Sequence, residues 1–248
     1  MGPSSTGTGT GAGFRVLSYN IRAMRDSREA LARVIAACRP DVVCLQEAPR
    51  LLFWRTRRRS LMRATGLVPA VNRRACGLAI LVRPGIGVRS RRHVLLTRRR
   101  GLHRRAVSMA LLEVAGGPVA VASTHLDLEE SARCDHAREA LEHLRRFAGT
   151  VPRVLAGDIN GVPGGAAWRI ITAELADAGA AAPLGEAATF SARRPRRRID
   201  AVFTGPGVRV LGSGVPVDEV DRADVEAATD HRPVVADLRP VPGTAPGR

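Results

Sequence analysis

The sequence has 248 residues, of which 45% are hydrophobic and only 3% aromatic. This length fits one substantial domain, and Val, Leu, Ile and Ala must fill most of its core. The net charge is +16 and the chain contains no lysine, so arginine carries the positive charge and attracts phosphate-bearing ligands. A genome with biased composition would produce the same arginine content, so the charge alone does not identify a partner. No apolar run approaches the length of a membrane span, and we expect no membrane anchor.

The first 13 residues have neither a basic start nor an apolar run, so we expect no signal peptide there. We expect a cytoplasmic monomer with a flexible segment at 1–13, one domain at 14–240 and a flexible tail at 241–248. The cysteines are Cys38, Cys44, Cys76 and Cys134. They show no CxxC spacing, which favours buried, reduced thiols over a zinc site or disulfides.

The predicted elements alternate many short strands with a few helices. In chain order we predict a strand at 14–19, a helix at 26–38, a strand at 41–46, a basic helix at 51–65, strands at 77–82, 88–96, 107–114 and 119–123, a helix at 131–147, a strand at 153–156, a helix at 166–176, and strands at 199–203, 208–211 and 234–238. Asp26 and Glu29 have the spacing of a capping box. This order favours two stacked sheets with outer helices over a regular βαβ repeat.

Short polar signatures lie at the ends of predicted strands, where a rigid scaffold presents reactive groups. They are Ser18-Tyr19-Asn20, Leu45-Gln46-Glu47, Ser123-Thr124-His125-Leu126, Gly157-Asp158-Ile159-Asn160, Arg198-Ile199-Asp200 and Thr229-Asp230-His231-Arg232-Pro233. Each has an ordinary explanation by itself, because a lone Asn forms turns and a lone Glu is usually solvated. The complete set of signatures, in contrast, predicts a catalytic site.

Together these side chains supply what hydrolysis of a phosphoester requires. Mg²⁺ prefers oxygen ligands and needs only one or two carboxylates, a role that suits Glu47 and Asp230. A nucleophilic water needs a base, for which Asp158 and His231 are the candidates, and Asn160 can fix that water with its amide.

Two further groups of side chains support this chemistry. Asp200 is placed to set the tautomer of the imidazole of His231. His125 and Asn20 are donors for the charge that develops on the phosphoryl oxygens.

In this order the motifs resemble the endonuclease/exonuclease/phosphatase superfamily, and the match extends from about residue 14 to 238. The resemblance implies an α+β fold, a four-layer α/β/β/α sandwich of two mixed sheets with outer helices and a site at one rim. It implies Mg²⁺ or Mn²⁺ bound by Glu47 with help from Asn20 and Asp230, and a contact between His125 and the scissile phosphate.

The resemblance also implies a phosphate-binding arginine before the predicted strand at 107–114. Arg105 is our candidate, and Arg104 is an equally placed rival. Cys76 departs from the pattern, because many nucleases of the superfamily have an aromatic residue at this position. This departure puts a nuclease-like phosphate contact in doubt without affecting the metal centre.

We therefore expect a divalent-metal-dependent phosphoesterase, with the phosphodiester bonds of nucleic acid as the leading substrate because of the charge. The first alternative is a phosphatase or phosphodiesterase for phospholipids or inositol phosphates, and the second is a catalytically silent binding protein. Arginine-rich runs lie at 55–59, 89–92, 98–105 and 193–198, and solvated surface explains them as well as a phosphate track does. Phe53 and Trp54 could stack on bases, but core packing is the favoured interpretation.

Overall fold

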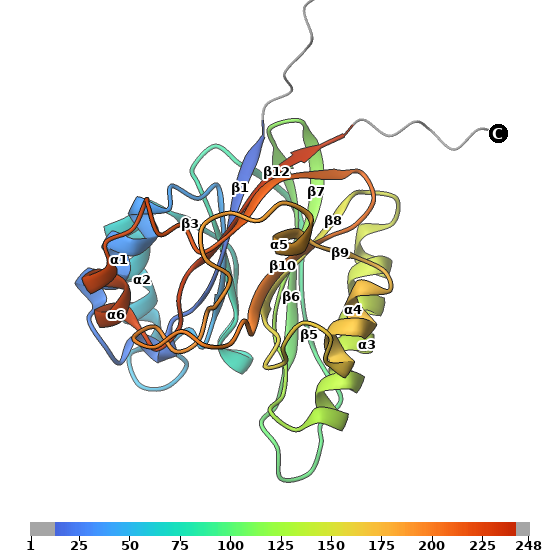
Figure 1. The fold of residues 1–248 in the computed structure, drawn as a ribbon, viewed down its shortest axis with the longest axis horizontal. Coiled ribbons are helices and arrows are strands. Elements are labelled where there is room, and N and C mark those ends of the chain that lie inside the picture. Colours follow the sequence, from blue (N-terminus) through green and yellow to red (C-terminus); the bar gives the residue numbers. More distant parts are fainter. Residues whose placement is uncertain (1–12, 242–248) are drawn as a thin grey trace, which may run out of the picture.

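The computed structural model describes residues 13–241, so the segments predicted to be flexible lie almost entirely outside the described residues. Two mixed six-stranded sheets stack face to face, and helices cover their outer faces (Figure 1). This is the expected four-layer α/β/β/α sandwich. None of the helices within the described range has the length and apolarity needed to span a bilayer.

The first sheet has the strand order β11-β12-β1-β2-β4-β3. Its strands are β1 (Phe14–Asn20), β2 (Val42–Gln46), β3 (Val68–Asn72), β4 (Ala79–Val82), β11 (Val208–Gly214) and β12 (Val234–Pro240). Its outer face carries α1 (Arg28–Ala37), α2 (Trp54–Thr65) and α6 (Arg222–Ala228) (Figure 1).

The second sheet has the order β5-β6-β7-β8-β10-β9. Its strands are β5 (Gly87–Leu95), β6 (Ala106–Val114), β7 (Gly117–His125), β8 (Arg153–Asp158), β9 (Ala176–Asp177) and β10 (Asp200–Thr204). The helices α3 (Glu130–Ala148) and α4 (Ala166–Thr172) cover its outer face, while the short α5 (Ala178–Ala181) follows β9 (Figure 1).

Alternation along the strands explains the three apolar layers between these four layers of structure. In β1, Phe14 and Val16 pack in the cluster between the two sheets, whereas Leu17 and Tyr19 pack under the helices of the first sheet. A third cluster lies between the second sheet and α3 and α4, and includes Trp168. Both faces of the central strands are therefore buried, which accounts for their almost continuous apolar runs.

The parallel strand pairs place the site. β1 runs parallel to β2, with Asn20 opposite Gln46, and β7 runs parallel to β8, with His125 opposite Asp158. The carboxyl ends of each pair therefore lie at one edge of their sheet, and the polar signatures that follow them come together there.

Several local predictions were wrong. The N-cap of α1 is Ser27, whose Oγ accepts a hydrogen bond from Ala30 N, so Asp26 and Glu29 do not form a capping box. The helix predicted at 166–176 ends at Thr172, and its last residue begins β9. The strand β3 and the helix α6 were not predicted.

The cysteines are all free thiols, as expected. Cys38, Cys44 and Cys134 are buried, but Cys76 is half-buried, so the prediction that all of them are buried was wrong for this residue.

Candidate active site

Asp158, the last residue of β8, lies at the centre of the polar cluster. Its Oδ2 accepts a hydrogen bond from Asn20 Nδ2 at 3.0 Å, and its Oδ1 accepts one from Asn160 N at 3.0 Å. The Nε2 atoms of His125 and His231 lie 3.4 Å and 3.7 Å from the same Oδ2. Burial raises the pKa of Asp158, the nearby charge of Asp200 raises it further, and the two imidazoles and Asn20 oppose that rise. A base with a raised pKa accepts a proton more readily.

Gly157 allows Asp158 to take this place. A Cβ atom at residue 157 would collide with the carbonyl oxygen of Thr124 on the neighbouring strand β7. Only glycine therefore lets β7 and β8 approach closely enough to bring His125 and Asp158 together.

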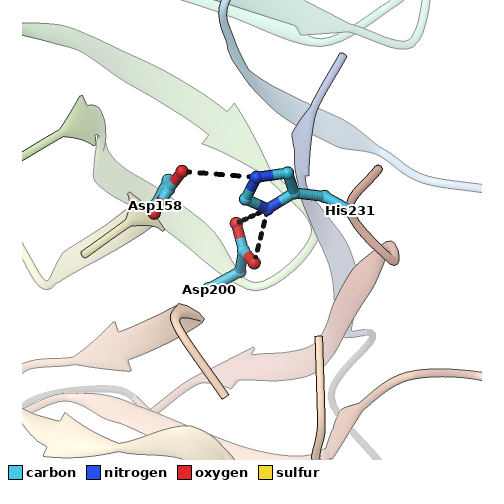
Figure 2. Close-up of side chains that lie close together, drawn as sticks. All are labelled: Asp158, Asp200 and His231. Atoms are coloured by element: carbon cyan, nitrogen blue, oxygen red, sulfur yellow. Dashed lines mark hydrogen bonds and ion pairs between the residues drawn. The ribbon is translucent and has the colours of Figure 1, made fainter. Parts of the chain in front are cut away.

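His231 lies between two carboxylates (Figure 2). Its Nδ1 is 2.9 Å from Asp200 Oδ2, while its Nε2 faces Asp158. Burial favours the neutral imidazole, but Asp200 and then Asp158 and Asp230 outweigh it and raise the pKa of His231 to about 9. The ring is therefore an imidazolium at neutral pH. Asp200, Asp158 and His231 are also close enough together to bind one metal ion.

Two residues that the sequence motifs did not identify support Asp200 and His231. Thr189 Oγ1 accepts hydrogen bonds from the backbone N–H groups of Ile199 and Asp200 at 3.0 and 3.1 Å. The ring of Phe190 packs against the imidazole of His231, with centroids 5.0 Å apart. Both lie in the irregular segment before β10, where no strand or helix pattern distinguishes them.

His125 differs from His231 in charge. Burial lowers its pKa to about 4, even though Asp158 acts in the opposite direction. Its ring is neutral at physiological pH, so it can donate or accept one hydrogen bond but carries no charge into the site.

Asn20 connects Asp158 to Glu47. Its Nδ2 also lies 3.2 Å from Glu47 Oε1, and its Oδ1 accepts a hydrogen bond from Arg22 N. Because a backbone N–H can only donate, this contact fixes the amide oxygen away from the carboxylates. Glu47 has a backbone φ of +49°, a left-handed conformation that is uncommon outside glycine and is typical of functional sites.

Asp230 is separate from this group. Its carboxylate lies 3.4 Å from Arg22 Nε and lines a neighbouring hollow together with Arg22 and Asp26. The structure thus directs His231 into the cleft and the side chain of Asp230 away from it.

Arg105 is buried beside the site, and its Nε lies 3.3 Å from Asp127 Oδ2. The other oxygen of Asp127 accepts a hydrogen bond from Glu129 N, which fixes the carboxylate in a turn. Arg104, the rival candidate, is exposed. Both arginines line the cleft, but only Arg105 is held in one position by a carboxylate. Asp127 directly follows the Thr-His-Leu motif, and that position is the one signal that could have identified it.

An open cleft of about 550 Å³ lies between the ends of the two sheets and is lined by Glu47, Arg105, His125, Asp158, Asn160 and His231. Its walls carry a second set of cations, namely Arg25, Arg50, Arg57, Arg104 and Arg197. The cleft therefore combines a buried acidic centre with a basic wall, an arrangement that suits a metal ion at the centre and an anionic ligand around it.

A model of the Endonuclease/Exonuclease/phosphatase family matches residues 17–231. A search of curated proteins gives no match. A solved endonuclease/exonuclease/phosphatase from Beutenbergia cavernae is 26% identical, with a TM-score of 0.71 over 95% of this chain and 74% of that one. A mannosyl-6-phosphatase from Bacteroides thetaiotaomicron is 20% identical, with a TM-score of 0.76 over 91% and 99% of the two chains. The human Nocturnin catalytic domain with bound sulfate is 18% identical, with a TM-score of 0.71 over 92% and 94%.

Proposed function

The chain belongs to the endonuclease/exonuclease/phosphatase family, whose members hydrolyse phosphoester bonds, and we propose that it cleaves phosphodiester bonds of nucleic acid with a divalent metal ion. The convergence of Asn20, His125, Asn160 and His231 on the carboxylate of Asp158 is the observation that carries this proposal. The basic wall of the cleft supports a substrate with several phosphates.

The donor set fits Mg²⁺ or Mn²⁺. Glu47 and Asp158 share one donor, the amide nitrogen of Asn20, so their carboxylates lie close together. Glu47 also forms no ion pair with any residue in the described part of the chain, which leaves its charge available to a cation. We assign Glu47 as the main ligand, with Asn20 as the residue that positions it and Asp230 as a more remote candidate. A bound ion would stabilise negative charge on the phosphoryl oxygens.

We assign the base to Asp158, because its pKa is raised whereas His231 is protonated and cannot accept a proton at Nδ1 or Nε2. Asn160 donates its Nδ2 hydrogen to Leu126 O at 3.0 Å, which leaves its Oδ1 to orient the attacking water. Asp158 then takes a proton from that water as the oxygen attacks phosphorus.

The remaining polar groups act on the phosphoryl group. The imidazolium of His231 and the neutral ring of His125 donate to its oxygens and stabilise the developing charge, while the guanidinium of Arg105 binds the phosphate of the substrate. Asp200 keeps His231 charged and correctly oriented. The mechanism needs no group from a second copy, so we propose a monomeric enzyme, and the free cysteines support a reducing compartment such as the cytoplasm.

The test is hydrolysis by purified protein with Mg²⁺, Mn²⁺ or EDTA. The panel contains single-stranded and duplex DNA, RNA, sphingomyelin vesicles and soluble inositol phosphates. Asp158→Asn should lower the turnover by ~10²–10⁴-fold with the fold intact. Glu142→Gln, the same kind of change on the exposed face of α3, is the matched control and should leave the rate unchanged.

Cleavage of lipid or inositol phosphate alone would preserve the assigned site and replace the proposed substrate. Metal-independent cleavage, or an Asp158→Asn variant with wild-type turnover, would refute the assignment of the site. Binding of DNA without hydrolysis of any ester would indicate a silent binding protein.

A further inference from the structure

Three consecutive apolar side chains are exposed to solvent, and the first of them lines the cleft. Leu51, Leu52 and Phe53 are 71%, 83% and 78% exposed, so the expectation that Phe53 packs in the core was wrong. We call these three residues the apolar rim. Leu51 lines the cleft, and so does Leu128, which follows β7 in the other sheet and is 71% exposed. Single exposed apolar residues need no explanation, but a contiguous run beside an active site indicates a binding surface.

The requirements of folding do not explain the apolar rim. Phe53 is the N-cap of α2, but its side chain cannot cap the helix as Ser, Asp or Asn would. Its backbone φ of +57° is also unfavourable for a bulky residue. An apolar side chain that neither caps nor packs is better explained by contact with a ligand.

Unpaired cations accompany the apolar rim. Arg50 precedes it, Arg57 lies one helical turn after it, and Arg104 comes from the loop between β5 and β6; all line the cleft. None of these arginines forms an ion pair with another described residue, although many other arginines of the chain do. Their guanidinium groups are therefore free to bind phosphates.

We infer that the apolar rim holds unpaired bases of a single-stranded nucleic acid while its phosphates follow Arg50, Arg57 and Arg104 into the cleft. This inference rests on the proposed function and specifies its substrate. A scissile phosphate at Asp158 would bring the neighbouring bases toward the apolar groups, since Asp158, Leu51 and Leu128 line the same cleft. In a duplex the bases are stacked inside and cannot pack on protein side chains, whereas a single strand exposes their faces.

The shape of this end of the molecule disfavours a flat lipid surface as the partner. The loop between β5 and β6 projects beyond the ends of both sheets (Figure 1). It carries the exposed arginines Arg98, Arg99 and Arg100. A bilayer would meet this charged loop first, whereas a flexible strand can pass beside it into the cleft.

The experiment measures binding by fluorescence anisotropy, with a labelled 12-nucleotide single-stranded DNA and the same sequence as a duplex, in EDTA to prevent cleavage. The triple variant Leu51→Ser/Leu52→Ser/Phe53→Ser should lose about tenfold or more in affinity for the single strand and much less for the duplex. Phe53→Trp should retain the affinity, because it keeps a stacking surface. Leu211→Ser, which changes a half-exposed leucine on β11, is the control and should match the wild type.

An equal loss of affinity for both forms of DNA, or no loss, would overturn the inference. Binding to phosphatidylglycerol vesicles that requires the apolar rim, without an effect on DNA, would also overturn it and assign the rim to a lipid surface. Hydrolysis of bis(p-nitrophenyl) phosphate by the wild type reports on the proposed function separately, because this ester is too small to need the rim. Hydrolysis of the small ester without rim-dependent binding would therefore refute this inference alone.

Discussion

Among single residues, Asp127 shows how one buried carboxylate can determine the position of a phosphate-binding group. Its Oδ2 accepts the Nε hydrogen of Arg105, so the two terminal nitrogens of the guanidinium can face the cleft. Its Oδ1 accepts a hydrogen bond from the backbone N–H of Glu129. Asp127 does not line the cleft, so we expect it to act through Arg105.

We predict that Asp127→Asn raises KM about tenfold and changes kcat less. The single amide oxygen of Asn can keep the bond to Glu129 N, but its NH₂ group then faces Arg105 Nε, where two donors oppose each other. Steady-state kinetics with an oligonucleotide would measure the split between KM and kcat. Asp224→Asn is the comparison, since Asp224 pairs with Arg33 outside the cleft and its loss should leave KM unchanged. A loss confined to kcat would mean that Arg105 acts in the transition state rather than in substrate binding.

At the scale of one element, α2 supports the loop that carries the apolar rim. Arg58 belongs to an arginine-rich run but is buried. Its guanidinium donates to Pro49 O at 2.8 Å, Ala48 O at 3.3 Å, Asn72 Oδ1 at 2.7 Å and Arg73 O at 3.0 Å. Burial lowers its pKa to about 10, so the group stays charged at neutral pH. One side chain thus ties the segment after Glu47 to α2 and to the end of β3.

We predict that Arg58→Leu lowers the free energy of unfolding by about 3 kcal/mol, because several buried carbonyl groups lose their donor. Activity should also fall, since Glu47 loses the support of the following segment. Arg59→Leu removes the same charge from an exposed position of the same helix and should change stability by less than about 0.5 kcal/mol. Urea unfolding of the two variants provides the measurement, and equal stability would show that the Arg58 contacts contribute nothing.

At the scale of the whole molecule, the fold and the centre of the cleft follow from patterns in the sequence. Buried parallel strands leave clear apolar runs, and polar residues that follow such runs must meet at one edge. Side-chain orientations that are set by tertiary contacts could not be predicted in this way. Asp230 and His231 are adjacent in sequence, but their side chains face different hollows. Arg58 and Phe53 reverse their expected environments, since the arginine is buried and donates to Pro49 O, whereas the phenylalanine at the N-cap of α2 is exposed.

The net charge is also a property of the whole molecule. The salt dependence of kcat/KM can distinguish the contribution of arginines in the cleft from that of arginines elsewhere on the surface. Arginines that contact phosphates displace counterions, so log(kcat/KM) for an oligonucleotide should fall linearly with log[salt]. Arg57→Ser should reduce the magnitude of this slope by roughly one. Arg209→Ser should hardly change it, because β11 pairs Val208 with Pro240 at the end of β12 remote from His231, and charges farther than ~10 Å are screened at 0.1 M salt.

Rates measured between 50 and 300 mM KCl (roughly the range in which counterion release is resolved) would test this. Bis(p-nitrophenyl) phosphate carries one charge and should show a much flatter dependence. If Arg57→Ser and Arg209→Ser reduced the slope equally, the arginines would act as a diffuse field rather than as a phosphate-binding wall. Such a result would mean that the high arginine content reflects only the biased composition of the sequence. A smaller slope for Arg57→Ser alone would instead mean that the cleft arginines bind the phosphates of the substrate.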